Sequence, residues 1–316
     1  MFSSAKQAWI LAAGAFSNEH EKYRRKQQYK SAWHAFVFPL FAAKWFNILN
    51  SSALKSVTQY RSRLYLKPFR IYMSTKWSKG RRVKVILDTY SFISDLGENF
   101  LLCVLDDGRF PIATFHLKDG AEATISIGYD ERYRKEGELV FFFDCEHLGG
   151  FIFGASFCFE NTPEKGWVCR IGCVQGTKNE NIVNAAQDFA HGLRPKSLMV
   201  FVIQEFCKCL NIHTLYGVGQ SIQAFRRKHA IHIQCLHKIH FNYNQLWTES
   251  GGEQGKDGWF LLPVLVHKKR MEEIKTNKRA MYRRRYMMMD NIARQISESV
   301  HLLTASTVKD EWSAVL

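Results

Sequence analysis

One carboxylate and one phenol in the last third of the chain are the side chains best suited to move a proton. Glu249 precedes the glycine pair Gly251-Gly252, and Tyr282 lies in a strongly basic segment near the C-terminus. A carboxylate can act as general base beside an amine, and a tyrosine hydroxyl can act as general acid. We therefore take Glu249 and Tyr282 as candidate catalytic residues. A solvated loop around Glu249 is the simpler competing interpretation.

Two cations flank the predicted start of a helix, where an anion is readily bound. Arg194 and Lys196 enclose a proline, and Gly192 precedes them in the loop. Free backbone N–H groups and the helix dipole favour negative charge at such a start. With Gly176 at the end of the preceding strand, these residues could cradle a phosphate. The alternative is an ordinary helix start with two exposed cations.

A second pair of cations lies in the basic C-terminal segment. Arg279 and Arg283 are four residues apart and would share one face of a helix. Two guanidinium groups on one face can clamp a phosphate or a carboxylate. A solvated basic helix with its methionines turned inward is the competing interpretation.

The eight cysteines and twelve histidines show no metal-ligand spacing. There is no CxxC pair, and no cysteine has companion histidines at zinc spacing. We interpret the clustered His229, His232, His237 and His240 as polar residues at the edges of strands and not as metal ligands. We therefore expect no metal and a reduced, cytosolic protein with buried thiols.

Positive charge is concentrated in two parts of the chain. Segment 22–87 contains nine lysines, seven arginines and no acidic residue, and segment 268–294 has ten basic residues against three acidic ones. The whole chain carries a net charge of +15. This distribution favours contact with a polyanion, either anionic lipid, a phosphorylated lipid precursor or RNA. Charge alone does not choose among them, and the sequence names no protein partner.

Aromatic residues interleave with lysines in the same N-terminal third of the chain. They are Trp33, Phe36, Phe38, Phe41, Trp45 and Phe46. The pattern suits a helix that lies in a membrane interface, and the alternative is a helix pair whose rings face the core. No stretch reaches the ~20 apolar residues of a membrane-spanning helix, and no clean signal peptide is present. We expect a cytoplasmic protein that is at most peripheral at the inner membrane.

Hydrophobic periodicity predicts an α+β protein in two parts. Residues 1–95 form a basic helical N-terminal region, and residues 96–316 form a core that ends in a basic C-terminal helix. Predicted strands lie at 101–105, 110–117, 121–127, 138–143, 151–159, 167–174, 213–218 and 259–264. Predicted helices of the core lie at 181–189, 195–210, 242–248 and 277–301. Period-two alternation and Asp-Gly turns favour a mixed, largely antiparallel sheet.

A series of short motifs occurs in an order that resembles the VirK/YbjX family of enterobacterial proteins. The motifs are IGCVQG at 171–176, GLRPK at 192–196, LYGVG at 215–219, LWTESGG at 246–252, DGWFLLP at 257–263 and KRAMYRRRY at 278–286. Upstream, KPFRIY at 67–72 and DTYSF at 88–92 also resemble that family. The resemblance implies a bacterial virulence factor that supports envelope integrity, resistance to cationic antimicrobial peptides, and expression or surface display of outer-membrane virulence proteins.

The order of elements between positions 167 and 219 is similar to the acyl-CoA N-acyltransferase (GNAT) fold. In that fold a splayed strand and the next helix N-terminus cradle the cofactor pyrophosphate. The similarity implies an acyl-CoA or aminoacyl donor held by Arg194 and Lys196, and transfer to an envelope precursor. The GNAT signature Q/R-x-x-G-x-G/A is absent, and Pro195 removes one backbone donor. An acyltransferase-like enzyme and a non-catalytic polyanion-binding factor both remain open.

Overall fold

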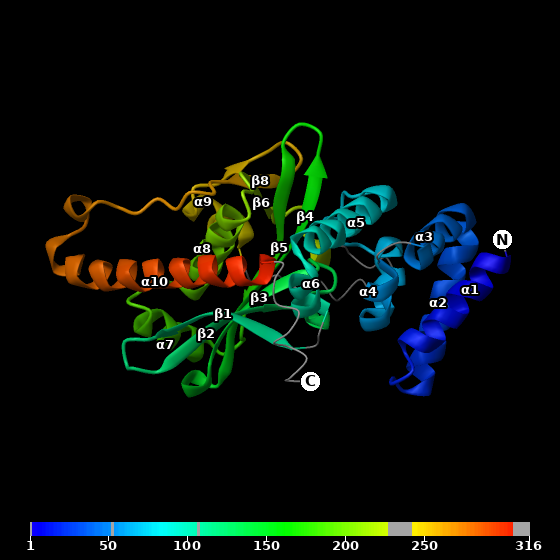
Figure 1. The fold of residues 1–316 in the computed structure, drawn as a ribbon, viewed down its shortest axis with the longest axis horizontal. Helices are drawn as coiled ribbons and strands as arrows, with labels where there is room; N and C mark the ends of the chain where they lie inside the picture. The colour runs from blue at the N-terminus through cyan, green and yellow to red at the C-terminus, as the bar shows by residue number, and fades with distance from the viewer. Residues whose placement is uncertain (1, 52–53, 106–107, 227–241, 306–316) are drawn as a thin grey trace.

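Helices gather at the N-terminal end of the protein, and an eight-stranded sheet with further helices packed against it forms the rest (Figure 1). The computed structural model describes residues 2–51, 54–105, 108–226 and 242–305. This arrangement confirms the predicted α+β class. The histidine cluster at 229–240 and Cys235 lie outside the described residues.

The N-terminal region consists of short helices whose breaks are set by proline and by polar caps. They are α1 (Phe2–Ala15), α2 (Glu21–Val37), α3 (Pro39–Ser51), α4 (Leu54–Tyr60), the 3-10 helix η1 (Ser62–Phe69) and α5 (Lys79–Leu96). Pro39 opens α3, where its missing N–H costs no hydrogen bond. Ser78 caps α5, because its Oγ accepts a hydrogen bond from Arg81 N at 3.2 Å.

Small and aromatic residues pack the N-terminal helices together. Ala12 of α1 and Ala35 of α2 are completely buried, which lets the two helices lie close to each other. Trp45 of α3 donates from Nε1 to Tyr65 O at 2.9 Å, and the Tyr65 hydroxyl lies 3.3 Å from Ser31 Oγ. These contacts connect α2, α3 and η1 into one packed unit.

The sheet is antiparallel except for one central pair of strands. Its strands are β1 (Arg109–His116), β2 (Glu122–Gly128), β3 (Leu139–Cys145), β4 (Gly150–Thr162), β5 (Gly166–Gly176), β6 (Thr214–Val218), β7 (Glu253–Gln254) and β8 (Trp259–Leu262). Their order is β1-β2-β3-β4-β5-β6-β8-β7. β5 and β6 pair in parallel, from Val168 opposite Thr214 to Ile171 opposite Gly217. The predicted mixed, largely antiparallel sheet is confirmed.

Helices pack onto this sheet and cover its first strand. They are α6 (Glu98–Leu105), α7 (Glu180–Phe189), α8 (Pro195–Cys209), α9 (Tyr243–Glu249) and α10 (Arg279–Thr304), with 3-10 turns η2 (Glu131–Tyr133), η3 (Glu146–Leu148), η4 (Ala224–Arg226), η5 (Met271–Glu273) and η6 (Thr276–Lys278). α10 contacts both β1 and α8 (Figure 1). Gln295 of α10 accepts from Thr114 N at 2.9 Å and donates to Thr114 O at 2.7 Å. The amide thus takes the place of a neighbouring strand at this edge of the sheet.

One predicted strand is wrong, because residues 101–105 are helical. They form the end of α6, in which the four-residue spacing of Phe100 and Val104 turns both side chains into the core. Phe100 packs against Phe206 of α8, with ring centres 6.0 Å apart. A short apolar run does not distinguish a strand from a buried helix by periodicity alone, which explains the error.

Candidate functional site

Three of the predicted site residues meet in one surface contact at the start of α8. Arg194 Nη1 lies 2.8 Å from Glu249 Oε2, and Lys196 Nζ lies 3.5 Å from the same oxygen. Gln245, one turn earlier in α9, donates from Nε2 to Glu249 Oε1 at 2.9 Å. The cations predicted to hold a donor and the carboxylate predicted to act as a base are therefore paired with each other, which leaves one positive charge in excess.

This contact changes the basicity of Glu249. Partial burial would raise the pKa of Glu249, but hydrogen bonds from Arg194 and Gln245 outweigh it and hold the pKa below its ordinary value. A carboxylate with a lowered pKa is a weaker proton acceptor. A base role for Glu249 would require its ion pair with Arg194 to open.

The loop before α8 is joined to α10 by an arginine that the sequence analysis did not single out. Arg285 donates from Nε and Nη2 to His191 O at 3.1 and 2.8 Å, and its guanidinium carbon lies 4.2 Å from the centre of the Tyr282 ring. Gly192 has a φ of 74°, in the left-handed region. A Cβ at this position would lie 2.9 Å from Arg285 Nη2. Packing of α10 against the loop is therefore one reason for glycine at position 192.

The remaining predicted residues lie apart from that contact. Arg279 donates from Nε to Ile274 O at 3.1 Å, whereas Arg283 is exposed on the next turn of α10. Gly176 is the last residue of β5 and is paired with Phe153 of β4. Their predicted part in ligand binding stays a prediction.

The pairing of β5 with β6 ends at Ile171, and a side chain of α9 contacts β5 beyond this residue. The Tyr243 hydroxyl donates to Cys173 Sγ at 3.3 Å. Trp247, one turn later, is completely buried. In the GNAT fold the splayed strand helps to cradle the cofactor, whereas here α9 packs against that part of β5.

Three adjoining cavities lie along η1. The polar cleft, of about 440 Å³, lies between residues 14–18, 60–63 and 129–131. The cationic groove, of about 40 Å³, lies between residues 63–72 and 129–135. The apolar slot, of about 250 Å³, lies between residues 10–15 and 46–65. None of the three is lined by a residue that the sequence predicted for the site.

Basic side chains make up most of the charged lining of the cationic groove. Its lining contains Arg63, Lys67, Arg70, Arg134 and Lys135, and one carboxylate among the described residues, Glu131. Behind the lining, Arg63 pairs with Glu19 at 2.7 Å, and Lys67 pairs with Glu138 at 2.6 Å. With these partners counted, the groove still holds two more cations than anions.

Burial disfavours the ionised forms of two cations in the groove. It lowers the pKa of Arg70, although the next largest effect, that of Tyr65, raises this pKa, and the smaller effects of Arg134 and Arg63 lower it. Burial, followed by the charges of Arg134 and Arg70, lowers the pKa of Lys135. Like charges that disfavour each other's ionised forms are relieved by an anion placed between them. The groove therefore favours a negatively charged ligand.

A buried polar cluster forms the floor of this groove. Lys67 Nζ lies 2.6 Å from Glu138 Oε2, and the Tyr90 hydroxyl donates to the same oxygen at 2.9 Å. Burial first, and then the charge of Glu138, raise the pKa of Tyr90 well above its ordinary value. Tyr90 thus stays protonated and remains a donor to Glu138.

A second buried carboxyl group, that of Glu136, has no cation beside its side-chain oxygens among the hydrogen bonds of the described residues. Gln223 donates from Nε2 to Glu136 Oε1 at 2.7 Å, and burial raises the pKa of Glu136 to about 8. Burial and the nearby Glu136 raise the pKa of the Cys173 thiol, which argues against a nucleophilic thiolate. Gly172 lies so close that a Cβ there would be 2.0 Å from Glu136 O.

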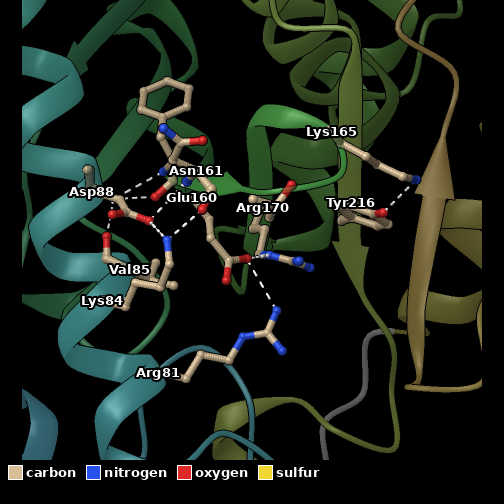
Figure 2. Close-up of polar contacts among 12 residues, drawn as sticks. Arg81, Lys84, Val85, Asp88, Glu160, Asn161, Lys165, Arg170 and Tyr216 are labelled. Carbon is tan, nitrogen blue, oxygen red and sulfur yellow. Dashed lines mark hydrogen bonds and ion pairs between the residues drawn. The ribbon is translucent and has the colours of Figure 1, made fainter.

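Figure 2 shows a further buried ion pair, between Glu160 of β4 and Arg170 of β5. Arg81 of α5 approaches Glu160 Oε2 to 3.2 Å. The rings of Tyr216 and Trp259 have their centres 4.5 and 4.9 Å from the Arg170 guanidinium carbon, within cation–π range. The cluster joins α5 to β4, β5, β6 and β8, and we interpret it as structural.

Large apolar side chains remain exposed on α2 and at the start of α3. Tyr29 and Trp33 are 66% and 64% exposed at four-residue spacing, and Leu40 is 86% exposed. In contrast, Trp45 and Phe46 are buried. The rings therefore face the core in the later part of this segment and face solvent in the earlier part.

Two classes of feature are absent from the part of the chain that the structure describes. Within residues 2–51, 54–105, 108–226 and 242–305, no group of three or more His, Cys, Asp or Glu side chains is arranged to hold a metal ion. Within the same ranges, no helix is both long enough and apolar enough to cross a bilayer.

The sequence profile of a family described as "Protein of unknown function (DUF535)" matches residues 20–298. The chain belongs to this family. The DUF535 match includes all five cations of the groove and begins after α1. A protein named YbjX, from Escherichia coli K12, is 26% identical over 283 residues, which cover 87% of this chain and 84% of the relative. The expected resemblance to the VirK/YbjX family is confirmed.

Two proteins from Haemophilus influenzae are similar over shorter segments. One is 36% identical over 135 residues, covering 42% of this chain and 44% of the relative. The other is 31% identical over 153 residues, covering 46% of this chain and 48% of the relative. The chain thus matches less than half the length of each.

A cAMP-binding acyltransferase from Mycobacterium smegmatis, solved as a mutant, is a distant structural neighbour. It has a TM-score of 0.34 and 9% sequence identity, covering 73% of this chain and 64% of that chain. A similarity this distant supports no conclusion on activity.

Proposed function

We propose that the protein binds a phosphate-bearing anion in the cationic groove. The observation that carries this proposal is the charge imbalance: five basic side chains surround about 40 Å³ of space, against one lining carboxylate among the described residues. That space holds roughly three water molecules, which suits the terminal oxygens of a phosphate monoester. Arginine guanidinium groups also match phosphate in bidentate geometry.

The exposed face of α2 favours anionic lipid as the source of the phosphate. Tyr29 and Trp33 lie on this face, and Lys26 and Lys30 are exposed on the same helix. Rings and cations on one helix suit the headgroup layer of an anionic membrane. In this proposal the protein acts in the cytoplasm and is peripheral at the inner-membrane surface.

This binding fits the role that the resemblance to the VirK/YbjX family implies. Phosphate is the charged group of anionic lipids and of phosphorylated lipid precursors. In this proposal, binding of such a group lets the protein act on the envelope, and through it on antimicrobial-peptide resistance and on expression or surface display of outer-membrane virulence proteins. In this proposal the protein acts by binding alone, without catalysing a reaction.

The test is calorimetric binding of glycerol 3-phosphate, with Arg70→Gln/Lys135→Gln as the groove variant. The control is Lys178→Gln/Lys256→Gln, which removes the same charge from exposed sites outside the cavities. We expect the groove variant to bind at least about tenfold more weakly, as the loss of two charge-assisted hydrogen bonds implies, and the control to bind like the native chain. No binding by the native chain, or equal loss in both variants, overturns the proposal.

A second arm of the same test decides between lipid and RNA. Co-sedimentation with phosphatidylglycerol vesicles is compared with binding of a single-stranded RNA at equal ionic strength. We expect vesicle binding that weakens when Trp33→Ser removes an exposed ring. RNA binding that is lost in the groove variant, without vesicle binding, overturns the lipid source.

A second candidate function is acyl or aminoacyl transfer to an envelope precursor. The observation that favours it is the parallel pairing of β5 and β6. The connection between these strands contains α8, which begins at Pro195. Arg194 and Lys196 would hold the donor, with Glu249 or Tyr282 handling the proton. Arg194→Glu should abolish binding of acetyl-CoA without lowering the unfolding midpoint. Unchanged acetyl-CoA binding excludes this donor site.

A further inference from the structure

We infer that the ligand of the cationic groove carries a single acyl chain, and that this chain lies in the apolar slot. The inference rests on the proposed binding of a phosphate and adds the apolar part of the ligand. The class of ligand is therefore a single-chain phosphate amphiphile.

The slot has the lining that a hydrocarbon chain requires. Leu11, Phe46, Leu49 and Tyr65 contribute to its walls, and Ile10 stands at its edge with 60% of its surface exposed. Phe46, Leu49 and Tyr65 are buried and thus fixed in place. Each methylene group that enters such surroundings tightens binding by roughly fourfold.

The slot and the groove each share lining residues with the polar cleft. Gly14, Ala15 and Ser62 line both the slot and the cleft. Arg63, Tyr129 and Glu131 line both the cleft and the groove. The lining therefore changes along one path from apolar, through polar, to cationic. An acyl chain, a polar linker and a phosphate follow one another in the same order.

The dimensions favour one chain rather than two. The slot of about 250 Å³ is bounded by α1 on one side and by α3 on the other. The three cavities together fall within the range of roughly 300–1,000 Å³ that ordinary ligand sites occupy. A lipid with two chains would leave the second chain outside the slot.

Gly14 offers a way to block the connection without touching the groove. It lies on α1, borders both slot and cleft, and does not line the groove. A Cβ built at Gly14 meets no atom within 4 Å. Leucine also has a higher helix propensity than glycine, so Gly14→Leu should fold while its side chain enters the connection. Ser3→Leu, on the exposed side of the same helix, is the matched control.

Calorimetry with two probes tests the inference: 1-oleoyl lysophosphatidate, kept below its critical micelle concentration, and glycerol 3-phosphate. We expect the native chain to bind lysophosphatidate at least tenfold more tightly than glycerol 3-phosphate. Gly14→Leu should weaken lysophosphatidate at least about tenfold, equivalent to two methylene groups no longer buried. Glycerol 3-phosphate should bind Gly14→Leu unchanged, and Ser3→Leu should bind both probes like the native chain.

The outcomes separate this inference from the proposal on which it rests. Equal native affinity for the two probes, or unchanged lysophosphatidate binding by a folded Gly14→Leu, overturns the acyl-chain assignment and leaves phosphate binding in place. If the native chain binds neither lysophosphatidate nor glycerol 3-phosphate, phosphate binding itself is overturned. A series of lysophosphatidates of increasing chain length tests the native chain without any variant. Affinity that does not rise with chain length overturns the assignment.

Discussion

Lys67 and Glu138 form an ion pair whose charged atoms lie 2.6 Å apart, with the side chains only 9% and 0% exposed. The pair joins η1 to the residue before β3, and so fixes one wall of the cationic groove to the sheet. Arg63, on the same 3-10 helix, and Arg70, directly after it, line that wall. The position of the groove's cations therefore depends on this buried contact.

Removing one member of the pair should be far more harmful than replacing both. Lys67→Met leaves the Glu138 carboxylate buried without its cation, and we expect a loss of about 3–5 kcal/mol in the free energy of unfolding. Lys67→Met/Glu138→Leu should recover part of that loss, because two apolar side chains need no charged partner, whereas the buried Tyr90 hydroxyl loses its acceptor. Urea unfolding with an unchanged slope measures both. A single variant as stable as the native chain would contradict the prediction.

Glu136 should make the protein less stable as the pH rises toward 8. Its pKa is raised from 4.5 to about 8 in the folded chain, mainly by burial. The folded state therefore binds the proton more strongly than the unfolded state. The stabilisation is complete below pH 4.5 and is lost as the pH rises through about 8.

Glu136→Gln should remove most of this pH dependence, because the amide does not titrate. The measurement is the free energy of unfolding in urea at the two ends of the window. Glu253→Gln, which changes an exposed carboxylate, is the control and should keep the native slope. The same slope in Glu136→Gln as in the native chain would show that another group titrates.

Glu160 contacts two arginines, Arg170 and Arg81, and the two contacts should contribute unequally to stability. Glu160→Gln removes the charge that compensates Arg170. The Arg170 and Glu160 side chains are 6% and 5% exposed, so we expect a loss of about 3–5 kcal/mol in the free energy of unfolding. Arg81→Gln removes a contact that is 41% exposed on the arginine side, and should cost less than about 1 kcal/mol. Thermal unfolding compares the two variants. Equal shifts in Tm would argue against a structural role specific to Arg170.

The surface pair of Arg194 and Glu249 should matter little for stability. The two side chains are 48% and 32% exposed, and exposed pairs contribute ~0–1 kcal/mol. Arg194→Ala should therefore keep the native unfolding midpoint and let the pKa of Glu249 rise, since Arg194 lowers it. NMR titration of the Glu249 carboxyl carbon measures the shift. A pKa that does not rise would mean that Lys196 and Gln245 suffice to hold it down.

The fold follows from local patterns wherever those patterns are long. Period-two alternation identified the strand at 121–127, which the structure places at Glu122–Gly128. Apolar residues at four-residue spacing identified α8, which begins at Pro195 as expected. The strand expected at 101–105 is part of α6. The prediction was wrong because the run has only five apolar residues, which are too few to establish a period.

The groove could not be predicted in the same way, because its walls come from separate parts of the chain. Arg63 and Arg70 belong to the acid-free segment, whereas Arg134 and Lys135 follow η2 some sixty residues later. Motif spacing describes neighbours along the chain, not neighbours across a cavity. The absence of acidic residues between positions 22 and 87 was the one available signal, and it pointed to an anion without locating it.

The close approach of Gly172 to Glu136 affects the pKa of the Glu136 carboxyl group. A methyl group there would lie 2.0 Å from the carbonyl oxygen of Glu136, so any larger residue must push the two backbones apart. The widened gap would admit water to the Glu136 carboxyl group, and hydration would restore its ordinary acidity. The protonation state of this buried carboxyl group therefore depends on the absence of a side chain at position 172.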